Sequence, residues 1–91
     1  MYEIVRSKKY RRSIKKLKAS GSFSEYEFDK VIDILATGET LPKKHQDHAL
    51  SGSMSGYREC HVKSDLLLVY YKEDKVLILV LVDIGSHSDL F

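Results

Sequence analysis

The 91-residue chain contains one cysteine, one proline and no tryptophan, and it has no long apolar run. Cys60 has no second cysteine with which to pair, so we expect a fold held by its core in a reducing, cytoplasmic compartment. The longest purely apolar run, residues 76–82, is far shorter than the ~20 residues that span a bilayer, and no secretory leader is recognisable. The five glycines are too scattered for a phosphate-binding loop, a dinucleotide fingerprint or a nucleophile elbow, which excludes enzymes built on those motifs.

The length predicts one domain over residues 1–91. Domains commonly need roughly 100–200 residues, so the chain is too short for two. Its hydrophobic content of 43% is sufficient for a packed core, and no repeat or linker divides it.

Charge is distributed unevenly along the chain. Residues 1–20 carry a formal charge of +7 and the remaining residues carry −5, which together give the net charge of +2. This asymmetry indicates a cationic surface for a polyanion or for an acidic partner protein. The alternative is a solvated helix face without a partner.

The first quarter of the chain predicts a strand followed by a helix. Residues 2–5 read as a short strand. From there the apolar residues Tyr10, Ile14 and Leu17 recur at helical spacing among lysines and arginines. Gly21 is suited to the left-handed position that ends such a helix.

A second helix is predicted from residue 25 onward. Ser24 is its expected N-cap, and Glu27, three residues later, would complete a capping box. Phe23 and Phe28 have the spacing of a hydrophobic staple, and Gly38 is expected to end the helix.

The second half predicts a loop and then three strands. Residues 43–56 are polar and rich in small side chains, so we expect an ordered loop with little regular structure. Strands are predicted at residues 57–62, 66–72 and 76–84, the last two joined tightly at Glu73-Asp74. Their nearly continuous apolar content predicts strands covered on both faces. The expected fold is therefore α+β: an N-terminal strand, two helices covering one face, and an antiparallel meander of about three strands.

Residues capable of acid–base chemistry are expected to meet on one face of this sheet. Strand alternation places Glu59 and His61 together. Asp65 follows the next bend, His48 lies in the polar loop, and His87 follows the last strand. Each histidine is alternatively an ordinary hydrogen-bonded surface group. Three histidines with a carboxylate also suit a metal such as zinc, although their irregular spacing does not favour one.

Several other residues have a structural interpretation. Cys60 alternates to the face opposite Glu59, as does Arg58, and we expect an inert buried thiol there. Four aromatic residues are most simply core: Tyr10, Phe28, Tyr70 and Tyr71. Phe91 is either a hydrophobic plug or a surface on which a base can stack.

Four short motifs occur in order in the second half of the chain. They are Asp47-His48-Ala49-Leu50-Ser51-Gly52, Gly56-Tyr57-Arg58-Glu59-Cys60-His61, Asp65 followed by Leu68-Val69-Tyr70, and Gly85-Ser86-His87-Ser88-Asp89-Leu90-Phe91. In these motifs the chain resembles the YafQ-type branch of the RelE/ParE toxin superfamily, small bacterial ribosome-dependent mRNA endonucleases paired with antitoxins. The first half matches that family in layout only.

The resemblance implies a RelE/ParE-like microbial ribonuclease fold and an mRNA interferase, an endoribonuclease that needs no cofactor. Messenger RNA would be cut in the decoding region of the 30S ribosomal subunit, by attack of a ribose 2′-hydroxyl on the adjacent phosphate. That reaction needs a base, a cation and an acid. Carried over by position, His87 would be the proton donor and Asp65 the general base, while His48 and His61 would hold or neutralise the phosphate.

The remaining substrate contacts are less direct. Glu59 and Phe91 would orient the substrate, Phe91 by stacking on a base. Many relatives carry an arginine four residues before the final histidine, where this chain has Asp83. A carboxylate would repel the phosphate if it faced the cleft, so Lys63 or Arg58 is expected to supply the missing positive charge.

The resemblance also implies two macromolecular partners, the ribosome and an acidic antitoxin. The basic first helix is expected to contact ribosomal RNA or the antitoxin. The residues concerned are Lys8, Arg11, Arg12 and Lys15. We expect a monomeric free toxin that forms an oligomer with its antitoxin. Asp83 favours the alternative of a non-catalytic ParE-like binding toxin or a weakened enzyme, and a metal-dependent hydrolase is a third possibility.

Overall fold

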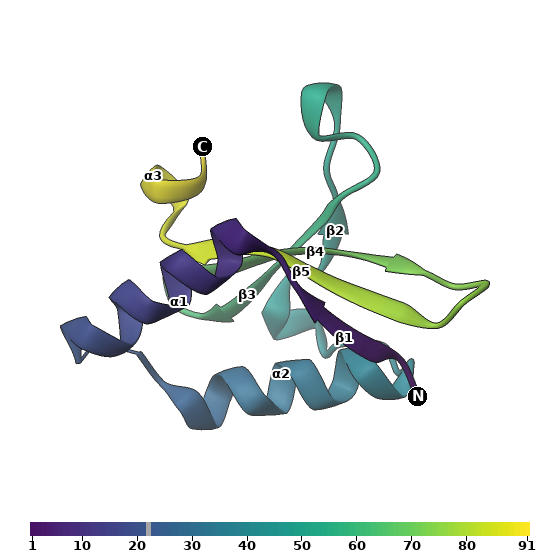
Figure 1. The fold of residues 1–91 in the computed structure, drawn as a ribbon, viewed down its shortest axis with the longest axis horizontal. Helices are drawn as coiled ribbons and strands as arrows, with labels where there is room; N and C mark the ends of the chain where they lie inside the picture. The colour runs from purple at the N-terminus through teal and green to yellow at the C-terminus, as the bar shows by residue number, and fades with distance from the viewer. Residues whose placement is uncertain (22) are drawn as a thin grey trace.

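A computed structural model describes residues 1–21 and 23–91, and in it the chain forms one five-stranded sheet with helices around it (Figure 1). The strand order is β1-β5-β4-β3-β2. The elements in chain order are β1 (Glu3–Arg6), α1 (Lys8–Ser20), α2 (Glu25–Thr37), the 3₁₀ turn η1 (Lys43–His45), β2 (His48–Ala49), the 3₁₀ turn η2 (Gly52–Met54), β3 (Arg58–Lys63), β4 (Leu66–Glu73), β5 (Ile78–Gly85) and α3 (His87–Leu90).

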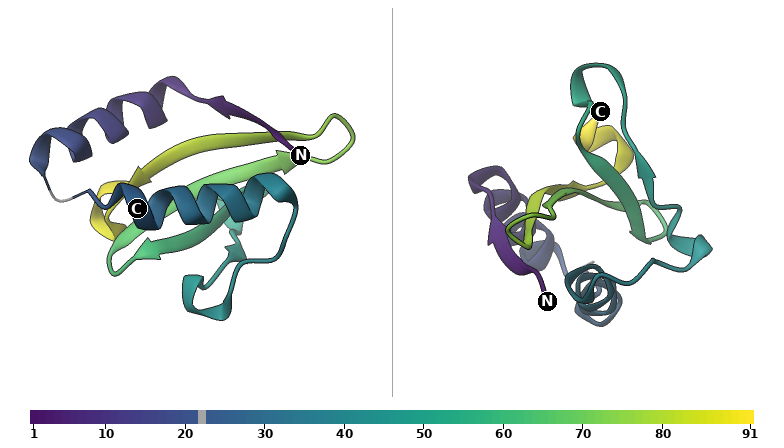
Figure 2. Two further views of the ribbon diagram at one scale, coloured as in Figure 1. Left: turned by 90° about the horizontal axis from the view of Figure 1, so that it is seen from below. Right: turned by 90° about the vertical axis from the view of Figure 1, so that its right-hand side faces the viewer.

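The helices are divided between the edge and the two faces of the sheet. α2 lies under one face, and α1 continues from β1 and packs against β5, whose residues 78–81 pair with β1 (Figures 1 and 2). α3 and the loop that carries η2 both stand on the face opposite α2 (Figures 1 and 2). The α+β class and the antiparallel meander of β3, β4 and β5 are confirmed. The first strand pairs in parallel with β5, so it joins the sheet at the far side of the meander.

α1 is capped by Ser7 and ends at Gly21, as predicted for its end. The Ser7 hydroxyl oxygen accepts a hydrogen bond from the Tyr10 amide at 3.0 Å, as an N-cap does, and donates to the Val82 carbonyl at 2.6 Å. Gly21 ends the helix in the left-handed region, with φ of 75°. The Ser7 hydroxyl therefore starts the helix and also fixes it to β5.

The predicted capping box at the start of α2 is wrong, although the staple is confirmed. Ser24 occupies the N-cap position, but its side chain makes no capping hydrogen bond. Its ψ is 97°, whereas Ser7, whose side chain does cap, has a ψ of 162°. The rings of Phe23 and Phe28 lie 5.4 Å apart, so the helix entry is set by this apolar contact.

Two boundaries in the second half differ from the prediction. The polar segment 43–56 contains η1, β2 and η2, because β2 pairs with β3 and becomes the edge of the sheet. β5 begins at Ile78, two residues later than expected, because the apolar run continues into the turn. Val76 and Leu77 are 64% and 47% exposed, and Leu77 has a positive φ of 51°.

The sheet is buried on both faces of β4, as predicted. On the helix side, Cys60, Leu68 and Tyr70 belong to one core cluster together with Tyr10 and residues of α2. Burial raises the pKa of the Cys60 thiol to about 12, which makes it the inert group expected. Tyr71 is not in this core. It is half-buried on the opposite face, where its ring lies 5.6 Å from that of Tyr57. No helix among the described residues is long and apolar enough to cross a membrane.

Candidate functional site

Strand register gathers His48, Glu59 and His61 on the face opposite α2. His48 of β2 lies directly across from Glu59 of β3. His61 is two residues further along β3, so its side chain leaves the sheet on the same side as Glu59. Two of the three predicted site histidines therefore share one face with the predicted carboxylate.

The third histidine reaches the same face through β5. His61 pairs with Leu67 of β4, and Leu67 pairs with Gly85 at the end of β5. His87 begins α3 two residues after Gly85, and α3 stands on the side of the sheet opposite α2 (Figure 1). Segments that are distant in sequence thus place His87 over the end of the sheet at which His61 lies.

The geometry at His48 fixes which ring nitrogen faces Glu59. Nδ1 lies 2.7 Å from the Gln46 carbonyl oxygen, so Nδ1 carries a proton and donates it. Nε2 then faces Glu59 Oε1 at 3.7 Å, and the Glu59 side chain is only 5% exposed. When Nε2 is protonated as well, the ring and the buried carboxylate form an ion pair. Such a ring can neutralise an anion at the surface while Glu59 holds it in place.

The backbone amide of His87 is hydrogen-bonded to the side chain of Asp65. The His87 amide donates to Asp65 Oδ1 at 3.2 Å, so this carboxylate helps to set where α3 begins. The Phe91 amide donates to the His87 carbonyl at 3.0 Å, and the two rings lie 5.4 Å apart. Three residues predicted for the site are therefore in one unit, with the His87 and Phe91 side chains exposed to solvent.

The short helix that carries His87 is held by a capping box. Ser86 Oγ accepts from the Asp89 amide at 3.2 Å, and Asp89 Oδ2 accepts from the Ser86 amide at 3.1 Å. These bonds with Ser86 lower the pKa of Asp89. The sequence analysis missed α3, because four residues are too few to show a helical period, although Ser86 and Asp89 have the spacing of a capping box.

His45 and Asp47 support the site and were not singled out by the sequence. His45 is buried, and its Nδ1 lies 2.6 Å from the His61 carbonyl oxygen, which ties η1 to β3. Asp47 Oδ1 accepts from the Tyr70 hydroxyl at 2.6 Å and from Arg58 Nε at 3.2 Å. Asp47 thereby anchors the segment that leads into His48.

Arg58 lies on the helix side of the sheet, whereas Lys63 lines a cleft of about 460 Å³ together with Asp65, Ser86 and Asp89. Arg58 pairs with Tyr70 on the helix side of the sheet, and its guanidinium is engaged by Asp47. A register shift after His61 places Lys63 opposite Leu66, which packs against the core on the helix side. Arg58 is therefore not placed to supply the positive charge that the sequence analysis assigned to it, whereas Lys63 lies close to Asp65.

Asp83 is turned away from the centre of the site face and toward α1. It lies across from Val69, which in turn lies across from Glu59. Its Oδ1 accepts from the Ser13 hydroxyl at 2.6 Å and from the Ile84 amide at 2.8 Å, and Oδ2 lies 3.7 Å from Lys9 Nζ. The Asp83 carboxylate therefore links α1 to β5, and its negative charge is paired with Lys9.

We expect Asp83→Ala to destabilise the fold. The substitution leaves the Ser13 hydroxyl and the buried Ile84 amide without their acceptor, which should lower the free energy of unfolding by about 1–3 kcal/mol. Urea denaturation followed by circular dichroism measures this loss. Asp33→Ala, at an exposed position of α2, is the control and should shift stability by no more than about 0.5 kcal/mol. Equal stability of the two variants would contradict the role given to Asp83.

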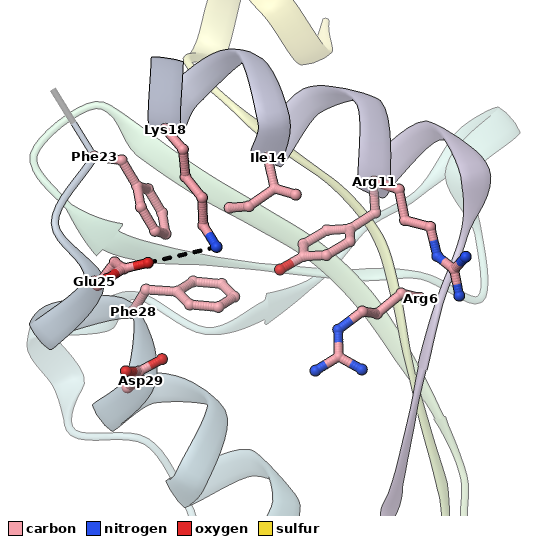
Figure 3. Close-up of a pocket in the computed structure, with 9 residues that line it drawn as sticks. Arg6, Arg11, Ile14, Lys18, Phe23, Glu25, Phe28 and Asp29 are labelled. Atoms are coloured by element: carbon pink, nitrogen blue, oxygen red, sulfur yellow. Dashed lines mark ion pairs between the residues drawn. The ribbon is translucent and has the colours of Figure 1, made fainter. Parts of the chain in front are cut away.

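The four cationic residues predicted to contact RNA or the antitoxin are exposed on α1: Lys8, Arg11, Arg12 and Lys15. Arg11 also borders a groove between α1 and α2, with a volume of about 400 Å³, whose apolar side chains include Ile14 and Phe28 (Figure 3). Lys18 crosses this groove to Glu25 at 3.4 Å (Figure 3). The positive charge of α1 therefore faces several directions.

Comparison with known proteins gives a consistent family assignment. A family model described as "Bacterial toxin of type II toxin-antitoxin system, YafQ" matches residues 2–91. The crystal structure of a metal-bound toxin from Helicobacter pylori is 43% identical and superposes with a TM-score of 0.90 over all of both chains. YafQ from Escherichia coli strain BL21(DE3) is 25% identical, with a TM-score of 0.89 over 100% of this chain and 99% of its own. The E. coli DinJ-YafQ complex gives a TM-score of 0.87 at 26% identity, covering 100% of this chain and 99% of the other.

The curated relatives match over shorter segments. The mRNA interferase toxin YafQ of E. coli K12 is 43% identical over 51 residues, which cover 56% of this chain and 53% of the relative. A YafQ toxin of Haemophilus influenzae is 57% identical over 30 residues, 33% of this chain and 29% of that protein. The chain thus spans about half or less of the length of these curated relatives.

The metal in the H. pylori structure raises the question of whether this chain holds one. Among residues 1–21 and 23–91, no group of three or more histidine, cysteine, aspartate or glutamate side chains is arranged to hold a metal ion. His48 and Glu59 form only a pair. The reaction considered below is therefore argued from the side chains of this chain alone.

Proposed function

The chain belongs to the YafQ family of bacterial type II toxin–antitoxin toxins, and on this premise we propose that it is a ribosome-dependent endoribonuclease that cleaves mRNA. The observation that carries the proposal is the placement of His48, His61 and His87 on one face of the sheet, with Glu59 and Asp65 beside them. Imidazoles can donate, accept or hold a proton near neutral pH, as cleavage by an internal hydroxyl requires.

In the proposed reaction the ribose 2′-hydroxyl attacks the adjacent phosphate, and the bond to the 5′-oxygen of the next nucleotide breaks. Asp65 accepts the hydroxyl proton through its Oδ2, because Oδ1 is engaged by the His87 amide. His87 gives a proton to the departing 5′-oxygen. His48, backed by Glu59, and His61 neutralise the charge on the phosphate. The product is a 2′,3′-cyclic phosphate and a free 5′-hydroxyl, so no water is consumed in this step.

Phe91 is suited to orient the substrate. The residue is 53% exposed, and its ring lies 5.4 Å from the ring of His87. An exposed aromatic ring beside the proton donor offers a stacking surface for a base next to the scissile phosphate. Glu59 orients His48 instead of contacting the RNA, since its side chain is nearly inaccessible.

We also propose that the chain binds a cognate antitoxin. A structural relative was crystallised as the DinJ-YafQ complex, at a TM-score of 0.87. The exposed cations of α1 supply a surface that an acidic antitoxin can recognise by charge.

The test is cleavage of a defined mRNA on purified ribosomes. Wild-type protein should cut ribosome-bound mRNA, leave the same mRNA intact without ribosomes, and lose activity when the antitoxin is added. Primer extension maps the cuts and end-labelling identifies the 5′-hydroxyl. Growth arrest without any cut would instead support the non-catalytic binding toxin, and activity abolished by a chelator would support a metal-dependent hydrolase.

A further inference from the structure

The positive charge of α1 is arranged in separate stripes along the helix. Tyr10, Ile14 and Leu17 form the stripe that packs on the core. Lys9 and Lys16 lie on one side of it, at a spacing of seven residues that keeps them on the same face. The outer side carries another pair of lysines with the same spacing, at positions 8 and 15.

The Lys9 and Lys16 side of the helix faces the end of the sheet that carries the candidate site. Both lysines line a cleft of about 420 Å³ together with Asp83 and Gly85 of β5 and Asp89 of α3. Lys9 Nζ lies 3.7 Å from Asp83 Oδ2. Lys16 is close enough to Asp89 to contribute to lowering the pKa of that carboxyl, after the larger effect of the Ser86 hydrogen bonds. α3, which also carries His87, forms the far wall of this cleft.

These lysines remain available to a ligand. The Lys9 side chain is 73% exposed although it points toward Asp83. Lys9, Arg12, Ser13 and Lys16 also line an adjoining depression of about 330 Å³ whose lining includes no acidic residue. The carboxylates of the first cleft are engaged in holding the fold, Asp83 by Ser13 and Ile84, and Asp89 by Ser86. The lysines of this surface are thus exposed to solvent, while its carboxylates are hydrogen-bonded within the fold.

The proposed reaction requires cations near the site that can bind the phosphates of the RNA. Arg58 lies on the helix side of the sheet, and Lys63 lies at the end of the sheet in a cleft with Asp65 and Ser86. A strand of RNA in the site carries one phosphate per nucleotide, and phosphates are held by lysine and arginine side chains. The cleft lined by Lys9 and Lys16 meets this end of the sheet through Asp89, so α1 adds two further cations there.

We propose that Lys9 and Lys16 bind the phosphate backbone of the RNA strand that occupies the candidate site, with Asp83 holding Lys9 at the edge of the sheet. This inference rests on the proposed function, and it separates the substrate contacts on one side of α1 from the surface formed by Lys8 and Lys15. The two lysines are positioning residues, because they hold the strand beside the reacting groups and take no part in proton transfer.

The test compares two matched double variants, Lys9→Gln/Lys16→Gln and Lys8→Gln/Lys15→Gln. They remove equal charge, at equal spacing, from exposed positions of one helix. Each is combined with His87→Gln to prevent cleavage, and binding of a fluorescent single-stranded RNA is measured by anisotropy over a series of salt concentrations. The Lys9/Lys16 variant should bind at least about fivefold more weakly, with a salt slope smaller by about 1.4 for two lost phosphate contacts, whereas the Lys8/Lys15 variant should lose distinctly less affinity.

Further arms distinguish the possible failures. Lys9→Arg/Lys16→Arg should restore binding, and in the cleavage-competent background Lys9→Gln/Lys16→Gln should raise KM much more than it lowers kcat. Equal losses in both double variants, or unchanged RNA affinity with lost co-sedimentation with ribosomes, would overturn the inference, the latter by assigning the lysines to ribosomal RNA. If wild-type protein fails to cut ribosome-bound mRNA, the proposed function fails, and the anisotropy measurement still decides whether these lysines bind RNA.

Discussion

Replacement of His87 by glutamine should reduce single-turnover cleavage of ribosome-bound mRNA by about 10²–10⁴-fold. Glutamine cannot give a proton to the departing 5′-oxygen, so the leaving group must depart as an unstabilised oxyanion. Its length is similar to that of histidine, and its backbone amide still donates to Asp65. The quantity to measure is the first-order rate of cleavage at saturating toxin.

The control for this variant is its stability and its binding. His87 is exposed and the helix that carries it is held by Ser86 and Asp89, so the melting temperature and the antitoxin affinity should match those of the wild type. A variant that cuts at the wild-type rate would remove His87 from the role of proton donor. A variant that unfolds would instead show that the ring has a structural role that its exposure does not suggest.

Asp65→Asn should lower the same cleavage rate by about 10²–10⁴-fold, almost as much as Asp65→Ala. The asparagine side-chain oxygen can still accept from the His87 amide, so α3 keeps its position, while the basic oxygen is lost. The single-turnover cleavage rates of both variants and of the wild type on ribosome-bound mRNA provide the measurement.

The comparison of the two Asp65 variants distinguishes a base from a positioning residue. An asparagine variant that keeps most of the activity, beside an inactive alanine variant, would show that Asp65 acts only by holding His87. The base would then have to be sought among the histidines of the same face. His61 is the first candidate, because its Nδ1 lies 3.4 Å from the Ser64 carbonyl oxygen, a distance at which a hydrogen bond is weak.

Features governed by neighbouring residues were predictable from the sequence. The apolar stripe of Tyr10, Ile14 and Leu17 predicts α1, and the spacing of Phe23 and Phe28 predicts the start of α2. Both patterns depend only on the geometry of a single helix. Alternation along β3 is equally local, so it correctly separates Glu59 from Cys60.

Features that depend on distant pairing were not predictable. A register shift at Val69 and Tyr70 leaves Val82 as an extra residue in β5, so Asp83 leaves the sheet on the side opposite to Leu81. Simple alternation would put Asp83 and Leu81 together. The partner of Asp83, Ser13, is 70 residues away in sequence, and no period or motif connects the two. The hydrogen bond between Arg58 and Asp47 could not be predicted for the same reason, because it depends on how β2 pairs with the sheet.

The parallel pairing of β1 with β5 has a consequence for how the protein is made. Glu3 pairs with Ile78 and Arg6 with Leu81, so the first strand has no partner until the last strand has been synthesised. α1 likewise packs mainly against β5. Contacts of such long sequence separation form late, because the intervening chain must be ordered first. We therefore expect the nascent polypeptide to acquire its native form only after β5 has emerged from the ribosome.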